Sequence, residues 1–284
     1  MVMKTYIQLT LFGLGMLFFT SCEDKITVDL NDAPPRLVIE ASLDWQKGSS
    51  GNDQTIALSL STPFFDTTIS NEVVGASVRV TNNDTQQVFN FIDQNNGLYS
   101  ISNFNPILNN SYSLEVIYNG ETYVATETLT SVAEITRVEQ SLEGGFDEEV
   151  LDVTIFFDDP SDADNFYFIR FVEEGDLFPI LETLSDEFIN GNEIDVFFEK
   201  DGDEGTDEAE FVPGDTVTMT LFGISESYFN YLDLLIEQYD SGGDPFSATP
   251  SRIKGNCINP TNPENYAFGY FRLTEFDKVN YTFE

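Results

Sequence analysis

The sequence predicts a mainly β protein, in which an N-terminal β-sandwich precedes a second β-rich domain that carries one packed α-helix. Three observations lead to this prediction. Short runs of β-branched and aromatic residues alternate with polar residues and recur about every ten positions. Hydrophobic residues make up 41% of the chain and aromatic residues 14%, which is enough to build a core. One segment near the C-terminus instead repeats its apolar residues with the period of a helix.

The first domain is expected over residues 36–131. A strong local signal is Asn119-Gly120, which separates two alternating runs. Both central positions of a type I′ turn need positive φ, and Asn and Gly tolerate it best, so a β-hairpin is predicted here. The other strands of this domain are predicted at 37–43, 56–61, 76–80, 88–92 and 99–101. Many short strands at regular spacing are typical of a sandwich.

The second domain is expected over residues 132–284, with a helix near 225–240. Ser225 is a suitable N-cap, and Gly242-Gly243 would end the helix. The apolar stripe would pack on the sheet, although a row of tyrosines could also form a ligand platform. The residues of this stripe are Tyr228, Tyr231, Leu232, Leu235, Ile236 and Tyr239. Strands are predicted at 150–157, 165–172, 194–198, 217–222, 267–273 and 279–283.

Residues 1–21 have the order of a secretory signal peptide. Lys4 precedes an apolar run over 6–19, and small residues follow it directly. As a helix this run would span roughly 21 Å, short of the hydrocarbon core of a bilayer at about 30 Å. The end of the segment (FTSC) resembles a lipobox, which predicts cleavage before Cys22 and lipidation of that cysteine. A buried or disulfide-bonded Cys22 after ordinary cleavage is the alternative.

Residues 22–35 would then form a lipidated tether that ends in Pro34-Pro35. Lipid chains on Cys22 would anchor the protein to a membrane. Directly after this cysteine come Glu23 and Asp24, an acidic pair that resembles a surface-export signal of bacterial lipoproteins. Simple solvation of the tether would also explain the pair. Cys257 is the other cysteine of the chain, so lipidation of Cys22 leaves no intramolecular disulfide.

The charge excludes several classes of function. The chain has 50 acidic residues, 12 Lys and Arg and no His, which gives a net charge of −38. A nucleic-acid partner is excluded because its phosphates require a basic surface. Without His there is no Ser-His-Asp triad, no Cys-His pair and no imidazole zinc site. The sequence therefore predicts a protein that is not an enzyme; a hydrolase that uses paired carboxylates is a minor alternative.

Several motifs occur together in one order. The first domain reads V-x-G-A-x-V-x-V (Val73–Val80), then G-L-Y (Gly97–Tyr99), then Y-S-L-E-V (Tyr112–Val116). This pattern resembles the immunoglobulin- and transthyretin-like sandwich of carboxypeptidase regulatory domains. The tether junction (PPRLVIEASL) and the segment Asn262–Phe271 (NPENYAFGYF) resemble a Bacteroidota outer-membrane lipoprotein family of unknown function. Genes of that family commonly lie beside those for SusC-type TonB-dependent transporters.

The resemblance implies a function and a location. The chain would be a surface-exposed outer-membrane lipoprotein that acts, without catalysis, as an accessory or binding subunit of a TonB-dependent nutrient transporter. The alternative is a calcium-stabilised adhesin or glycan-binding lipoprotein that works alone. The family brings no established catalytic residues, so none is expected here.

Two acidic loops are candidate calcium sites. Asp158, Asp159, Asp162 and Asp164 follow a predicted strand directly, and carboxylate oxygens are the ligands that Ca²⁺ prefers. The second loop is 201–208 (DGDEGTDE), whose glycine and glutamates do not fall at the offsets of an EF-hand. In a chain with this many acids, solvated loops would give the same pattern.

Trp45 is a candidate for stacking on a ligand. It lies just past the first predicted strand and before a Gly-Ser-Ser-Gly segment. An exposed indole can stack on sugars, and an anchor for the loop is the alternative.

Overall fold

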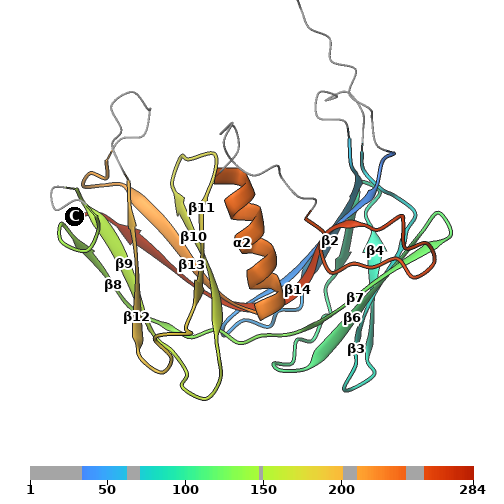
Figure 1. The fold of residues 1–284 in the computed structure, drawn as a ribbon, viewed down its shortest axis with the longest axis horizontal. Helices are drawn as coiled ribbons and strands as arrows, with labels where there is room; N and C mark the ends of the chain where they lie inside the picture. Colours follow the sequence, from blue (N-terminus) through green and yellow to red (C-terminus); the bar gives the residue numbers. More distant parts are fainter. Residues whose placement is uncertain (1–33, 63–70, 147–149, 201–209, 241–252) are drawn as a thin grey trace, which may run out of the picture. The chain divides into compact units, whose positions relative to one another are not determined.

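A computed structural model of the chain describes residues 34–62, 71–146, 150–200, 210–240 and 253–284 (Figure 1). Pro35–Glu284 is one compact unit. Its elements in chain order are β1 (Leu37–Gln46), β2 (Gln54–Leu60), β3 (Ser77–Asn82), β4 (Val88–Asp93), β5 (Leu98–Ile101), β6 (Ser111–Tyr118), β7 (Glu121–Thr128), β8 (Ile135–Ser141), β9 (Asp152–Asp158), β10 (Phe166–Glu173), β11 (Ile180–Ser185), β12 (Glu193–Glu199), β13 (Thr216–Ile224), α2 (Glu226–Asp240) and β14 (Phe268–Thr282).

Strand β14 connects the two halves of the fold. The described strands form a sheet of order β11-β10-β13-β14-β1-β2-β5-β4-β3-β6-β7 and a second sheet of order β12-β9-β8. The first part of β14 pairs with β1 in parallel, and its second part pairs with β13 in antiparallel orientation. The sequence predicted two strands here, but the structure has one of 15 residues. Its side chains face different cores along its length, which explains why the hydrophobic pattern appeared interrupted.

The first core lies between the strands of the N-terminal sandwich. Alternate residues of β1, β2 and β6 point into it, as the period-two pattern predicts. The segment that precedes β14 pairs with β7: the backbone of Ile258 exchanges hydrogen bonds of 2.8 and 2.9 Å with Val124. The side chain of Asn256 bonds to both the N–H and the C=O of Phe271 on β14. Ala267, Phe271 and Leu273 also belong to this core.

The second core lies between β10, β13 and β14 on one side and β12, β9 and β8 on the other. Strands β8 and β11 were not predicted from the sequence. Both are edge strands with mostly half-buried or exposed positions, so neither shows clear alternation. The division into domains 36–131 and 132–284 stays a prediction. Phe271 and Leu273, which belong to the second of these ranges, pack in the first core.

The predicted hairpin is confirmed. Asn119 and Gly120 have φ of 49° and 80°, as a type I′ turn requires, and they join β6 to β7.

Helix α2 is confirmed, but its apolar stripe is buried only in its first half. Ser225 caps the helix through its Oγ, which accepts a hydrogen bond of 3.2 Å from Tyr228 N–H. Tyr228 and Leu232 pack against an aromatic cluster on β10, β13 and β14. Leu235 and Tyr239 are 36% and 81% exposed, contrary to the prediction, because this cluster lies under the first turns only.

The fold class is therefore confirmed: the protein is mainly β, with a sandwich and one packed helix. Within the described ranges, no helix combines the length and hydropathy needed to span a membrane.

Candidate functional site

A polar cleft opens where two strands of the N-terminal sandwich separate. Strand β4 pairs with β3 over four residues, but it pairs with β5 only at Ile92 and Asp93. The rest of β4 diverges from β5 and β2, and a cavity of about 690 Å³ lies between them. We call this cavity the β4–β5 cleft.

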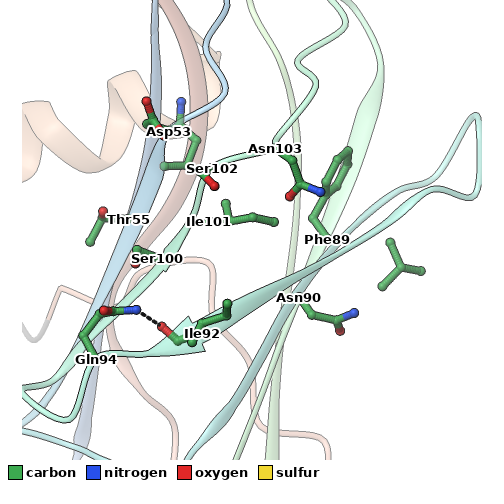
Figure 2. A pocket seen from close by; sticks show the side chains of 12 residues that line it. Asp53, Thr55, Phe89, Asn90, Ile92, Gln94, Ser100, Ile101, Ser102 and Asn103 are labelled. Carbon is green, nitrogen blue, oxygen red and sulfur yellow. Dashed lines mark hydrogen bonds between the residues drawn. The ribbon is translucent and has the colours of Figure 1, made fainter.

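Amide and hydroxyl side chains line the cleft from both sides. Asn90 comes from β4, Ser100 from β5, and Asn103 from the segment after β5 (Figure 2). None of these three side chains makes a hydrogen bond to the rest of the described chain, so their donors and acceptors are available to a ligand. Further lining residues are Asp53, Thr55, Gln94 and Ser102, with Val88, Phe89, Ile92 and Ile101 as the apolar part.

Internal hydrogen bonds hold the walls of the cleft in place. The buried side chain of Gln54 donates to the carbonyls of Asp44 and Gly51, at 3.0 and 3.1 Å. Asn52 donates to Phe104 O at 2.7 Å. On the opposite side, Gln94 donates to Ile92 O at 2.8 Å (Figure 2). A site held in this way loses little conformational entropy when it binds.

The chemistry of the cleft suits an uncharged, hydroxyl-rich ligand. Amides and hydroxyls offer both donors and acceptors, and the exposed Ile92 offers an apolar contact. Among the described residues, no Lys or Arg lines the cleft to neutralise an anion. Asp53 is the one carboxylate among these lining residues, whereas glycoside hydrolysis needs two carboxyl groups facing each other.

A buried ion pair supports the sheet beneath α2. Arg272 on β14 donates from Nε to Ser42 Oγ and from Nη2 to Asp44 Oδ2, both at 2.9 Å. Its guanidinium lies 5.2 Å from the ring centre of Phe222 and 4.9 Å from that of Tyr228. Burial raises the pKa of Asp44 more than Arg272 lowers it. Arg272 thus joins β1, β14 and α2 through one side chain.

The first acidic loop does not form the predicted cluster. Asp158, Asp162 and Asp164 are exposed. Asp159 is buried, where its Oδ1 accepts from the Tyr167 hydroxyl at 2.6 Å and its Oδ2 from Gly191 N–H at 2.8 Å. In the described part of the chain, no three Asp, Glu, His or Cys side chains converge to hold a metal. The second loop, 201–208, lies outside the described residues.

Trp45 is held within its own loop. Its indole N–H donates to Ser49 O at 2.9 Å. A Cβ on Gly51 would lie 2.7 Å from the Trp45 ring, so this glycine packs directly against the indole. Trp45 does not line the β4–β5 cleft. These contacts favour the loop anchor over the stacking platform.

The remaining predicted site residues divide by position. Cys22, Glu23 and Asp24 lie outside the described residues, so lipidation and surface export stay predictions. Cys257 is buried in the first core, and burial raises the pKa of its thiol to about 12. A thiol in this state is unreactive.

The C-terminal segment that carried the sequence resemblance has a structural role. Asn262 donates to Glu121 Oε1 at 3.0 Å, and Asn265 donates to Glu121 Oε2. These bonds, with Asn262 contributing most, lower the pKa of the Glu121 carboxyl. The segment is thereby fixed to the start of β7.

An apolar groove with an acidic rim lies between edge strands β11 and β12. It has a volume of about 380 Å³, and Phe146 and Ile180 line it with 89% and 47% of their surface exposed. The carboxylates of Glu182, Asp195 and Glu199 line it as well, and no Lys or Arg does within the described part of the chain. Burial raises the pKa of Glu182. Exposed apolar surface of this kind is typical of sites that bind another protein.

Comparison with known proteins places the chain in a family. The model of DUF4249, a domain of unknown function, matches residues 23–278. The chain belongs to this family. The match covers every strand from β1 to β13, helix α2 and the larger part of β14, so the cleft and the groove described above belong to the DUF4249 domain. No curated protein matches the chain.

Several solved structures match this DUF4249 chain at low identity and low TM-score. A DUF4785 family protein from Legionella pneumophila is 12% identical, with a TM-score of 0.26, over 66% of this chain and 52% of its own. The chicken CNTN1 FN1–FN3 domains are 12% identical, with a TM-score of 0.26, over 67% and 62%. Two fibronectin type III domains of chicken tenascin are 10% identical, with a TM-score of 0.21, over 66% and 90%. The chain spans about half the length of the first of these structures.

Sequence reasoning missed the β4–β5 cleft. Asn90 and Ser100 occupy the polar positions of alternating strands, which are usually only solvated. What makes them part of a site is the early separation of β4 from β5, and no residue pattern marks that separation.

Proposed function

We propose that this DUF4249 chain is a surface-exposed, lipid-anchored protein of the outer membrane that serves, without catalysis, as the accessory binding subunit of a TonB-dependent nutrient transporter. The observation that carries the binding role is the β4–β5 cleft, whose amides and hydroxyls are free to contact a ligand. The lipobox-like sequence before Cys22 and the following acidic pair support the location. The order of motifs in the sequence supports the transporter as partner.

The ligand is expected to be uncharged and rich in hydroxyl groups, as oligosaccharides are. Asn90 and Asn103 can each donate and accept, which matches vicinal hydroxyls. A protein partner is supported by the groove between β11 and β12, where Phe146 and Ile180 are exposed.

Co-purification tests the proposal. The full lipidated chain, extracted from outer membranes in several mild detergents, should retain a large β-barrel protein in a fixed ratio. A monomer without a barrel in every detergent would overturn the transporter role.

Binding of neutral oligosaccharides is then measured by calorimetry with Asn90→Ala and Asn103→Ala, and with Asn230→Ala on α2 as the matched control. Only the first two should weaken binding, by about fivefold or more for each lost hydrogen bond.

The second candidate is a glycan-binding lipoprotein that works alone. The same cleft supports it. Glycan binding by the purified chain, together with the absence of any barrel partner, would favour it over the transporter subunit.

A further inference from the structure

The groove between β11 and β12 has two walls of different kinds. Strand β12 lines it with the consecutive residues 195–199, whose side chains point alternately to the two faces of the strand. Strand β11 lines it with Ile180, Glu182 and Leu184, which lie two residues apart and so share one face. The groove is therefore bounded by an edge of β12 and by one face of β11.

The edge of β12 that borders the groove has no neighbouring strand in the described chain. Strand β12 is the terminal strand of its sheet and pairs with β9 alone. In an edge strand, half of the main-chain N–H and C=O groups point away from the paired neighbour, and an incoming strand can bond to them. Because β12 has seven residues, this edge extends over about 23 Å at about 3.3 Å per residue.

The side of the groove toward the second core is apolar. Val196 and Phe198 are buried in that core, and the half-buried Leu184 packs against it from β11. These three side chains also line the groove, together with Ile180, which is 47% exposed. A strand that paired with β12 would place alternate side chains over this surface and continue the layer of the sandwich. Those side chains should therefore be apolar.

The charges around the groove are negative. Asp195 on the outer face of β12 is exposed, and its carboxylate makes no hydrogen bond or ion pair with the described residues. On the opposite wall, burial raises the pKa of Glu182. An inward-facing charge on an edge strand discourages pairing with a wholly apolar strand. Since opposite charges on neighbouring strands stabilise their pairing, the outward residues of an incoming strand should be Lys or Arg.

We propose that the groove between β11 and β12 binds an extended segment of a partner protein in which apolar residues alternate with Lys or Arg. The segment pairs through its main chain with the edge of β12 and extends that sheet from three strands to four. Its apolar side chains cover Leu184, Val196 and Phe198, and its basic side chains lie beside Asp195. The inference deepens the partner role in the proposed function, and it does not require that the partner be a transporter.

A synthetic peptide tests the pairing. The probe is as long as β12, seven residues, alternates valine with lysine and carries a fluorophore. It is titrated into the full chain in detergent near physiological ionic strength, which screens diffuse attraction to the acidic surface. Fluorescence anisotropy should show saturable binding. A peptide of the same composition, with its valines and lysines in separate blocks, should bind at least about tenfold more weakly, because its valines cannot all face the core.

Hydrogen–deuterium exchange locates the bound peptide. The alternating peptide should slow exchange of the amides of residues 193–199, because pairing protects the free edge of β12. Strand β8, the other terminal strand of the same sheet, provides the internal control and should be unaffected. Protection that spares 193–199 would contradict the proposed pairing.

Two charge reversals separate the site from general acidity. Asp195→Lys should weaken binding of the alternating peptide by about fivefold or more, because it places like charges opposite each other. Glu139→Lys is the matched control, since Glu139 is also exposed, lies on β8 and changes the net charge equally. It should leave binding nearly unchanged. Near-UV circular dichroism verifies that both variants are folded.

Three results would overturn the inference. The first two are equal binding of the alternating and the block peptide, and equal effects of the two substitutions, since either would show diffuse attraction only. The third is a dimer, detected by sedimentation, that Asp195→Lys dissociates, because a second copy of the chain would then occupy the groove.

Co-purification with the barrel separates this inference from the proposed function. If the alternating peptide binds at β12 but no barrel is retained, the transporter role fails and the groove assignment stands. If a barrel is retained but the peptide does not bind, the groove assignment fails and the transporter role stands.

Discussion

Replacing Arg272 with Met should destabilise the folded unit markedly, because it leaves the Asp44 carboxylate without its ion-pair partner. The two side chains are 9% and 30% exposed, and their charged atoms are 2.9 Å apart. Removing one partner of a fully buried pair costs about 3–5 kcal/mol. Water reaches part of Asp44, which reduces this cost, while the lost bond to Ser42 adds about 1 kcal/mol. We expect Arg272→Met to lower the free energy of unfolding by about 2–4 kcal/mol.

The loss should depend on pH. Burial already raises the pKa of Asp44, and Arg272 is the larger of two opposing influences. Without Arg272 the pKa rises further, so the folded variant binds a proton more tightly than the unfolded chain does. The loss of stability is absent below the ordinary pKa of Asp, grows as pH rises from that value to the raised pKa of the folded variant, and is constant above it. Arg272→Met should therefore approach the stability of the unsubstituted protein as pH falls from neutral.

The assay is urea unfolding of Pro35–Glu284 between pH 4 and 8. Asp44→Asn in the Arg272→Met background should recover about 1 kcal/mol or more at neutral pH, since it removes the unpaired charge. Arg79→Met is the control, because the Arg79–Glu115 pair is exposed and worth at most about 1 kcal/mol. If Arg272→Met costs no more than Arg79→Met, or its loss is independent of pH, the reasoning about the buried pair is wrong.

Three further predictions concern single positions. Gly269→Ala should cost about 3 kcal/mol or more, measured by urea unfolding, because φ is +88° and a Cβ would lie 2.1 Å from Ile39 O across the β1–β14 pairing; a folded variant of unchanged stability would contradict this register. Ser225→Ala should cost about 1 kcal/mol by loss of the N-cap of α2, and an unchanged Tm would show that the cap is dispensable. Cys257 should resist iodoacetamide in the native protein at pH 8 and react once urea unfolds it, because it is 2% exposed; rapid native labelling would contradict the packing of the first core.

Local sequence patterns predicted the regular elements of the fold well. The Asn119-Gly120 turn and the Ser225 cap are decided by backbone chemistry within a few residues, and both have the expected geometry. Edge strands such as β11 were missed because half-exposed positions do not alternate. The continuity of β14 was missed because its partners, β1 and β13, are set by long-range packing.

The candidate sites depended on tertiary structure to a greater extent. The sequence grouped Asp158, Asp159, Asp162 and Asp164 by adjacency, whereas the fold buries Asp159 against Tyr167 and leaves the other three exposed. The β4–β5 cleft had no signal at all, since Asn90 and Asn103 are unremarkable in sequence and gain their role from strand separation. A residue's type and spacing can thus predict its local geometry, but not which distant side chains it will face.

Native mass spectrometry of the detergent-extracted protein tests the central claim most directly. We expect Cys22–Glu284 with a lipid mass on Cys22, in a complex whose additional mass is that of one large β-barrel protein. The same spectrum reports both the anchor and the partner. A lipidated chain that appears only by itself, in several mild detergents, would contradict the proposed role as a transporter subunit.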